Sequence, residues 1–430
     1  MDRSVPDNPG LPEVMGGDAL RADAAEVPER DRRSAPLAAN PKVSLVSLGC
    51  PKNIVDAEVL LGFLAEAGYA VTADDKDADI VLVNTCCFIE PALDESRQVI
   101  EELQARRKNG VLGALIVTGC LPQRYRDDDL RHTFPWVDAF VGPGDLPRIV
   151  SVVEKCRSRR RVRQITARPR WLYDHRTPRF RVTLPHVAYV KIAEGCFHGC
   201  SFCLIPSLRG DYRSRRMTSV VEEIRTLADA TAAGGGMLCE VDLVAQDTTA
   251  YGRDLYGRPR LTDLLKKILK EDLVPWIRLL YAYPHHLNGD LMDLLASEPS
   301  LCRYLDLPLQ HISDSVLRRM RRGVTRKTTL QLLERLRTRV PDLTLRTTLL
   351  VGFPGETDQD FLDLLDFVAT WKFERLGVFP FYAEEGTAAA TLPDPVPEEV
   401  KEERLHALMT VQQAISAERN RERVLSLIHI

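Results

Sequence analysis

The sequence predicts an α/β protein in which a flavodoxin-like domain with a parallel sheet precedes an open (β/α)6 partial barrel. Short apolar segments alternate with longer amphipathic ones from residue 43 to about residue 380. This alternation is typical of strands joined by crossover helices, which makes neighbouring strands parallel. A chain of 430 residues is also too long for one ordinary core and suits two or three domains.

The composition is that of a globular protein without a membrane anchor. Hydrophobic residues make up 44% of the chain and charged residues 28%, and no stretch approaches 20 apolar residues. The N-terminus has no basic segment followed by an apolar one, so we expect no secretion and no membrane partner. The predicted location is therefore the reducing cytoplasm, where clustered cysteines indicate metal or redox chemistry more than disulfides.

The N-terminal part divides into a leader and a first domain. Residues 1–40 are rich in Pro, Gly, Ala, Asp and Arg and lack apolar periodicity, which predicts a disordered leader. The first domain is predicted at residues 41–153. We expect its strands at 43–49, 80–84 and 114–118 and its helices at 54–67 and 92–108. Strands and helices in this order predict flavodoxin-like winding.

Residues 154–183 are predicted to form a basic linker. Between positions 155 and 181 the chain carries Lys155 and ten arginines against a single acid, Asp174. Two interpretations stay open. The stretch is either a solvated, partly flexible connection or a surface that attracts nucleic acid or ribosome through phosphate contacts.

The second domain is predicted at residues 184–420. Its strands are expected at 187–192, 239–245, 276–281, 304–307, 344–351 and 376–380, and helices at 217–232, 261–270 and 328–339. Six strands predict an open barrel, because a closed eight-stranded barrel needs more chain than is present. Residues 421–430 are predicted to be a truncated or non-native tail.

A cysteine motif follows the first strand of this second domain. Cys196, Cys200 and Cys203 have the spacing C-x3-C-x2-C. Structural zinc sites usually use four protein ligands, whereas three thiolates in one tight loop suit a four-iron cluster that keeps one iron free of protein ligands. His198 lies between two of these cysteines, and we interpret it as a loop residue rather than a ligand.

Three further cysteines share a position relative to the strands of the first domain. Cys50, Cys86 and Cys120 each come directly after a predicted strand. The carboxyl ends of parallel strands share one edge, where helix N-termini favour thiolates, so these residues are predicted to form a second three-thiolate site. The alternative is three small buried side chains. The remaining cysteines are predicted to be core or surface residues: Cys87, Cys156, Cys239 and Cys302.

The loop around Cys196 resembles the signature of the radical S-adenosylmethionine (SAM) superfamily. With two cysteine triads in this order, residues 42–420 resemble the methylthiotransferases, and most closely the branch that modifies a small-subunit ribosomal protein. The resemblance is carried by segments 47–53, 189–196, 204–210, 244–248, 305–311 and 351–357, among others.

The resemblance implies two 4Fe-4S clusters and two SAM molecules per reaction. One SAM would methylate sulfur held on the N-terminal cluster. The other, chelated by the open iron of the Cys196 cluster, would give a 5′-deoxyadenosyl radical that attacks the β-carbon of an aspartate in ribosomal protein S-twelve. An electron donor such as flavodoxin or ferredoxin is implied, and both clusters are expected to face one pocket between the domains.

Resemblance and position together indicate further site residues. By resemblance, Gly352, Gly355 and Glu356 border the adenosine of SAM, although a plain strand-to-helix turn fits them equally well. Gln246 and Gln310 end predicted barrel strands, where such barrels carry functional residues, and we assign them no individual role. Asp247 follows the same strand as Gln246, and its position is equally compatible with a functional role and with capping the next segment.

Two other functions are compatible with the sequence, and its C-terminal end departs from the family pattern. The rivals are a methylthiotransferase acting on tRNA adenosine and a non-catalytic protein that binds zinc and RNA. The family usually ends in a small TRAM β-barrel, which is predicted to be missing because residues 424–430 do not resemble the expected continuation.

Overall fold

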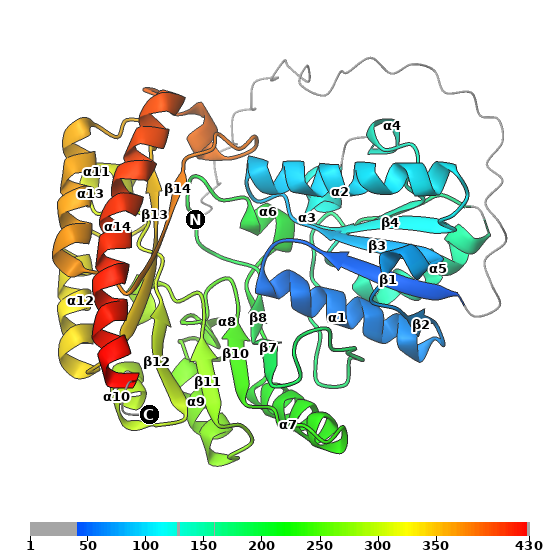
Figure 1. The fold of residues 1–430 in the computed structure, drawn as a ribbon, viewed down its shortest axis with the longest axis horizontal. Coiled ribbons are helices and arrows are strands. Elements are labelled where there is room, and N and C mark those ends of the chain that lie inside the picture. The colour runs from blue at the N-terminus through cyan, green and yellow to red at the C-terminus, as the bar shows by residue number, and fades with distance from the viewer. Residues whose placement is uncertain (1–40, 127–129, 159, 428–430) are drawn as a thin grey trace, which may run out of the picture.

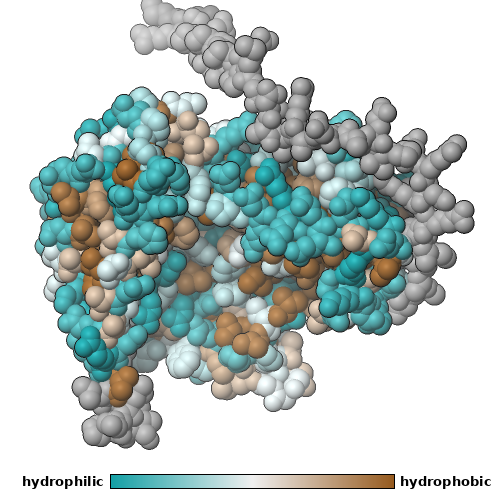
Figure 2. All heavy atoms as spheres, turned by 45° about the horizontal axis from the view of Figure 1, so that its top comes forward, coloured by the Kyte–Doolittle hydropathy of each residue, from teal (hydrophilic) through white to brown (hydrophobic). Residues whose placement is uncertain are grey.

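The computed structural model describes residues 41–126, 130–158 and 160–427. It contains two α/β units, each built on a six-stranded sheet (Figure 1). The predicted leader lies outside the described residues, as does the end of the predicted tail. On the face shown in Figure 2, hydrophilic residues predominate and a hollow runs between the two units. Within the described residues, no helix combines the length and the apolar character needed to cross a membrane.

The N-terminal sheet is parallel and has the strand order β2-β1-β3-β4-β5-β6. Its strands are β1 (Lys42–Ser47), β2 (Ala70–Val71), β3 (Ile80–Thr85), β4 (Ala114–Gly119), β5 (Ala139–Val141) and β6 (Val162–Gln164). The first five follow the flavodoxin order 2-1-3-4-5, so the predicted winding is confirmed. Every residue of β3 and β4 is buried, because helices cover both faces of the sheet.

The helices of this unit lie on the two faces of its sheet. They are α1 (Pro51–Glu66), α2 (Glu90–Lys108), α3 (Cys120–Arg124), α4 (Leu130–Thr133) and α5 (Ile149–Arg157). Apolar residues of α1 and α5 share one core cluster, whereas those of α2 belong to another. The sequence pattern did not predict β5 and β6, because strands of three residues are too short to show periodicity.

The C-terminal sheet is an open barrel, as predicted. Its parallel strands lie in chain order: β7 (Val187–Lys191), β10 (Glu240–Val244), β11 (Trp276–Leu279), β12 (Leu301–Asp306), β13 (Thr344–Val351) and β14 (Arg375–Pro380). A short antiparallel pair, β8 (Ala193–Glu194) with β9 (Arg213–Ser214), stands beside it. The long helix α14 (Glu398–Leu427) runs along β14 at the free edge (Figure 1).

The remaining helices of the barrel connect its strands. They are α6 (Ile205–Arg209), α7 (Met217–Ala233), α8 (Arg253–Tyr256), α9 (Leu261–Lys270), α10 (Gly289–Ser297), α11 (Asp314–Arg319), α12 (Arg326–Arg339) and α13 (Asp358–Trp371). The three helices predicted from periodicity correspond to α7, α9 and α12. The larger ones share one core with the outward-facing residues of the strands.

The basic stretch contributes to the packing of both units. It supplies β6, and Trp171 and Tyr173 pack against the core beneath α1. Arg179 is buried and pairs with two glutamates, Glu58 of α1 at 2.6 Å and Glu223 of α7 at 2.6 Å. Since these helices belong to different units, this arginine holds the units together and is not available for phosphate contacts.

We expect the Glu58→Gln substitution to lower the free energy of unfolding by about 3 kcal/mol, because it leaves the buried Arg179 with one counter-charge fewer. Urea denaturation followed by circular dichroism measures the change. Asp77→Asn is the control, since the Asp77–Lys42 pair is exposed and its loss should change stability little. Equal effects of the two substitutions would contradict the structural role of Arg179.

Candidate functional site

The first cysteine triad lies at one edge of the N-terminal sheet. Cys50 immediately precedes α1, Cys86 directly follows β3, and Cys120 opens α3 directly after β4. The strands β1, β3 and β4 are neighbours, so the three turns lie side by side. A Cβ atom added to Gly49 would lie 2.7 Å from Cys86 Cβ and 3.1 Å from its Sγ, which explains why glycine with a φ of +90° occupies that turn.

The thiols of this triad act on one another electrostatically. Burial, with the neighbouring Cys120, raises the pKa of Cys86 to about 12. Burial also raises the pKa of Cys120, whose Sγ accepts a hydrogen bond from Arg209 Nη2 at 3.5 Å. For Cys50, burial raises the pKa, but Lys52 and Arg209 outweigh it and the pKa is lowered. The three thiols therefore lie close enough to affect one another electrostatically, beside two cations.

The second triad occupies the loop that follows β8. The Cys196 amide donates to Gly210 O at 3.2 Å and the Cys203 amide donates to Cys200 O at 3.2 Å, which folds the loop tightly. Burial raises the pKa of Cys196 to about 11 and that of Cys203 to about 12, and the Cys200 thiol adds to both shifts. Arg322 Nη1 lies 3.7 Å from Cys200 Sγ and donates a hydrogen bond to it. This triad too combines clustered thiols with a cation.

His198 links the cysteine loop to the second barrel strand, a contact that the sequence did not predict. Its Nε2 lies 2.7 Å from Asp247 Oδ2, and its ring stacks on Tyr283 with 3.8 Å between the centroids. His286 Nδ1 contacts the same carboxylate oxygen at 3.2 Å. Asp247 Oδ1 also accepts the Ala250 amide at 3.1 Å, so the predicted cap exists alongside the histidine contacts.

The short helix α6 joins the two triads. It begins two residues after Cys203, packs against α3, and ends at Arg209, whose guanidinium touches Cys120 Sγ. The six residues from 204 to 209 are mostly helical, and at 1.5 Å per residue they place Arg209 only about 9 Å along the helix axis from Cys203. The triads, 76 or more residues apart in the chain (Cys120 to Cys196), therefore both lie at the junction of the two units.

A buried charge network lines the same junction. Asp56 of α1 accepts from Lys191 of β7 and from Arg209, and Lys191 also pairs with Glu194. Gln246 Nε2 donates to Glu194 Oε1 at 2.6 Å, so this predicted site residue belongs to the network. Although burial raises the pKa of Glu194, the nearby cations hold it at about 2.

The residues predicted near SAM form a tight turn against α14. Gly352 and Gly355 have φ values of +71° and +78° and leave no room for a side chain beside Lys401 and Arg319. Glu356 Oε1 accepts from Arg404 at 2.9 Å, and its other oxygen accepts the Phe353 amide at 3.1 Å. These hydrogen bonds show that Glu356 stabilises the turn. Its contact with the adenosine of SAM stays a prediction.

Gln310 occupies an unusual backbone conformation at the mouth of the barrel. Its φ is +71°, and its amide and carbonyl both pair with the backbone of β13, at Thr348 O and Leu350 N. A non-glycine residue with positive φ costs energy and is common where a site must be shaped. The prediction that Gln310 ends a barrel strand is therefore wrong in detail: β12 ends at Asp306, and Gln310 lies in the following loop, where it forms an isolated bridge with Leu349 of β13.

The buried side chain of His311 is expected to make the free energy of unfolding depend on pH. Burial lowers its pKa to about 4, so the native state keeps it neutral while the unfolded chain binds a proton below about pH 6.5. Between pH 6.5 and 4 its contribution to the free energy of unfolding should fall as pH falls, by up to about 1.4 kcal/mol per pH unit. Urea denaturation of the wild type and of His311→Asn across this range should show a flatter profile for the variant. Parallel profiles would contradict a neutral His311.

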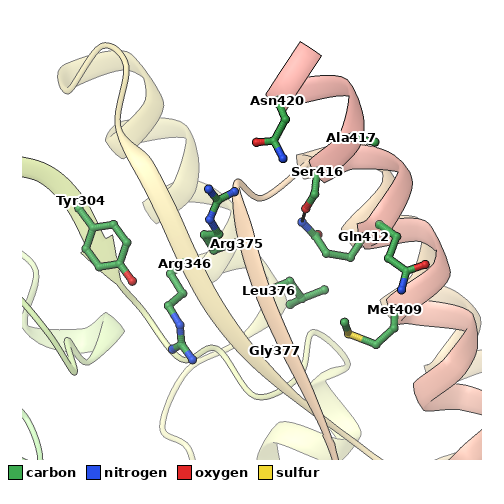
Figure 3. Close-up of a pocket in the computed structure, with 11 residues that line it drawn as sticks. Tyr304, Arg346, Arg375, Leu376, Gly377, Met409, Gln412, Ser416, Ala417 and Asn420 are labelled. Carbon is green, nitrogen blue, oxygen red and sulfur yellow. Dashed lines mark hydrogen bonds between the residues drawn. The ribbon is translucent and has the colours of Figure 1, made fainter. Parts of the chain in front are cut away.

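A further pocket lies away from the cysteines. A pocket of about 630 Å³ opens between the barrel and α14, with Tyr304, Arg346 and Arg375 on one side and Gln412 and Asn420 on the other (Figure 3). Arg375 begins β14, so this pocket sits toward the amino ends of the parallel strands. The cysteines lie at the carboxyl ends, and the pocket is separate from their site.

Comparison with known proteins agrees with this geometry. Residues 42–142 match the uncharacterized protein family UPF0004, and residues 190–368 match the radical SAM superfamily. Among solved structures, the radical SAM methyltransferase TsrM from Kitasatospora setae has a TM-score of 0.55 at 19% identity, covering 79% of this chain and 73% of that one. The cobalamin-dependent SAM radical enzyme OxsB has a TM-score of 0.53 at 11% identity, covering 87% and 56%. At these identities the likeness concerns the fold.

The open six-stranded barrel, its Cys196–Cys203 loop and the superfamily match define a radical SAM enzyme. The ribosomal protein uS12 methylthiotransferase RimO of Geobacter sulfurreducens is 50% identical over 383 residues, 89% of this chain and 84% of the relative. RimO of Pelotomaculum thermopropionicum is 46% identical over 389 residues, 90% and 86%. The chain belongs to the RimO family of methylthiotransferases, transferases that use 4Fe-4S clusters and SAM.

The residues present fit these cofactors. Each triad brings partly or fully buried cysteines near one another, and burial raises the pKa of Cys86, Cys120, Cys196 and Cys203. A bound metal ion supplies positive charge that favours the thiolate form of such residues. Three thiolates leave one iron of a four-iron cluster free. Hydrogen bonds from Arg209 and Arg322 to cysteine sulfur suit an anionic cluster. Both arginines were missed by sequence reasoning, although Arg209 lies within the matching segment 204–210.

Proposed function

We propose that this protein transfers a methylthio group to the β-carbon of an aspartate in the small-subunit ribosomal protein uS12. The observation that carries the proposal is the meeting of two cysteine triads at one junction through α6 and Arg209. Relatives named as uS12 methylthiotransferases, 46–50% identical over nearly nine tenths of the chain, support the choice of substrate.

Six cysteines are proposed to hold the two clusters: Cys50, Cys86 and Cys120 for one, and Cys196, Cys200 and Cys203 for the other. When bound, the clusters and SAM supply a carbon-centred radical and a methylated sulfur. Arg209 and Arg322 stabilise thiolate charge, and the Asp247–His198 contact fixes the second loop. The Asp56–Lys191–Glu194 network keeps the two units closed around the junction and excludes water from it.

The setting proposed for this reaction is the cytoplasm. The substrate is uS12, free or on the assembling ribosome, and a flavodoxin or ferredoxin supplies the electrons. The domain limits are proposed as a first domain at 41–153 and a radical SAM domain at 184–420. The connecting stretch 154–183 also contributes β6 to the sheet of the first domain. Within that proposal, Gly352, Gly355 and Glu356 border SAM, with Gln246 and Gln310 at the mouth of the barrel.

The test uses anaerobically purified protein with reconstituted clusters. Incubation with SAM, dithionite and a uS12 peptide containing the target aspartate should add one methylthio group, located by tandem mass spectrometry. A parallel incubation with unmodified tRNA, followed by nucleoside analysis, should give no product. Modified adenosine with an unmodified peptide would favour the tRNA-acting type. A colourless protein without sulfide would favour a zinc protein.

A further inference from the structure

Lys52 is a buried lysine at the junction of the two units. It lies in the first turn of α1, two residues after Cys50, and its side chain is almost fully enclosed, with a relative exposure of 7% for the residue. Its Nζ sits 3.1 Å from the centroid of the Tyr281 ring. Throughout the described part of the chain, this ammonium has no carboxylate within 4 Å and donates no hydrogen bond, and Glu194 and Asp306 act on it only from farther away.

The other buried cations of the junction all have polar or anionic partners. Lys191 pairs with Asp56 and Glu194, and Arg209 pairs with Asp56. The partners of Arg322 are Pro308 O and a cysteine sulfur. A buried charge is costly unless an opposite charge meets it, and an aromatic ring compensates only in part. Lys52 has no such partner in contact. The anionic group that acts on it most strongly is the Cys50 thiolate, so a directly paired anion has to come from outside the described residues.

The second unit holds the Tyr281 ring under Lys52. Tyr281 has a φ of +61°, uncommon for an aromatic residue, and the Thr248 amide fixes this turn by donating to Tyr281 O at 3.0 Å. Two residues on, Tyr283 stacks on His198 of the second cysteine loop. Lys52 thus lies two residues after Cys50 of the first triad. The ring that it contacts, Tyr281, lies two residues before Tyr283, which stacks on His198 of the second cysteine loop.

We propose that Lys52 binds the side-chain carboxylate of the substrate aspartate and so determines the substrate of the enzyme. This inference rests on the proposed function. The carboxylate carbon is bonded to the β-carbon, so holding the carboxylate fixes the reacting carbon between the triads. An adenosine base carries no carboxylate and leaves the ammonium unpaired, which disfavours tRNA. The competing role is a counter-charge for the cluster held by Cys50.

A double-mutant cycle separates these roles. Dissociation constants are measured by fluorescence anisotropy for reconstituted protein with a uS12 peptide and with the same peptide carrying Asp→Asn. For the wild type, the asparagine peptide should bind about tenfold to a hundredfold more weakly, as expected for a lost charge-assisted contact. In Lys52→Met that ratio should fall to about one, while iron and sulfide contents stay at the wild-type level. Lys266→Met, an exposed lysine of α9, should keep the wild-type ratio.

Each other result has a defined meaning. If Lys52→Met still prefers the aspartate peptide as strongly as the wild type, the inference is wrong and the proposed function stands. If Lys52→Met loses iron but keeps the preference, Lys52 is a counter-charge for the cluster and the inference is again wrong. If the wild type neither binds nor modifies the peptide, the proposed function fails, and the assignment of Lys52 fails with it.

Discussion

Replacement of Cys196 by alanine is expected to reduce the reductive cleavage of SAM to background level. Cys196, Cys200 and Cys203 are the three thiols of the second loop, and a four-iron cluster with two protein ligands would not be retained. Iron should fall from about eight to about four per chain, because the first triad does not share this ligand. Anaerobic assays of 5′-deoxyadenosine with dithionite as reductant, beside iron and sulfide analysis, measure both quantities.

Cys239→Ala serves as the matched control for that experiment. Cys239 directly precedes β10, and its Sγ donates a hydrogen bond to the carbonyl of Met237, far from both cysteine triads in the chain, so its replacement should leave iron content and SAM cleavage unchanged. Undiminished 5′-deoxyadenosine formation by Cys196→Ala would exclude the loop as the site of SAM cleavage.

Replacement of Cys120 by alanine is expected to separate the two halves of the reaction. Cys120 belongs to the first triad, so its loss should remove about four irons while the Cys196 loop keeps its own cluster. SAM cleavage should continue, and methylthio transfer to the uS12 peptide should cease because the sulfur-bearing site is gone. Quantifying 5′-deoxyadenosine and methylthiolated peptide in one reaction tests this uncoupling.

Cys87→Ala is the control for the first triad, because Cys87 is the cysteine adjacent to the proposed ligand Cys86. Cys87 is adjacent to Cys86 in sequence, but its side chain is fully buried in the core with Leu93 and Ile100. Its replacement should keep both products. Loss of transfer in Cys87→Ala with retention in Cys120→Ala would reassign the ligands of the first site.

Much of the fold followed from the sequence because its central elements are regular. The strands β3 and β4 are buried on both faces and appear as continuous apolar runs, and the barrel strands recur with helices between them. Elements at the periphery were harder to predict. The strand β6 consists of Val162, Arg163 and Gln164, and only its pairing with β5 makes it a strand. Similarly, Arg179 looked like part of a solvated segment until its two glutamates were seen.

The sequence by itself predicted the two cysteine triads, because one is a local spacing and the other repeats a single strand-end position. It also determined the winding of both sheets. Only the tertiary structure decided what surrounds the sulfurs. Arg209 reaches Asp56, 153 positions away, and Asn53, 156 positions away, while the Lys52 ammonium lies over a ring of the other unit. Charge pairing depends on distance in space, which periodicity and motif spacing do not encode across two domains.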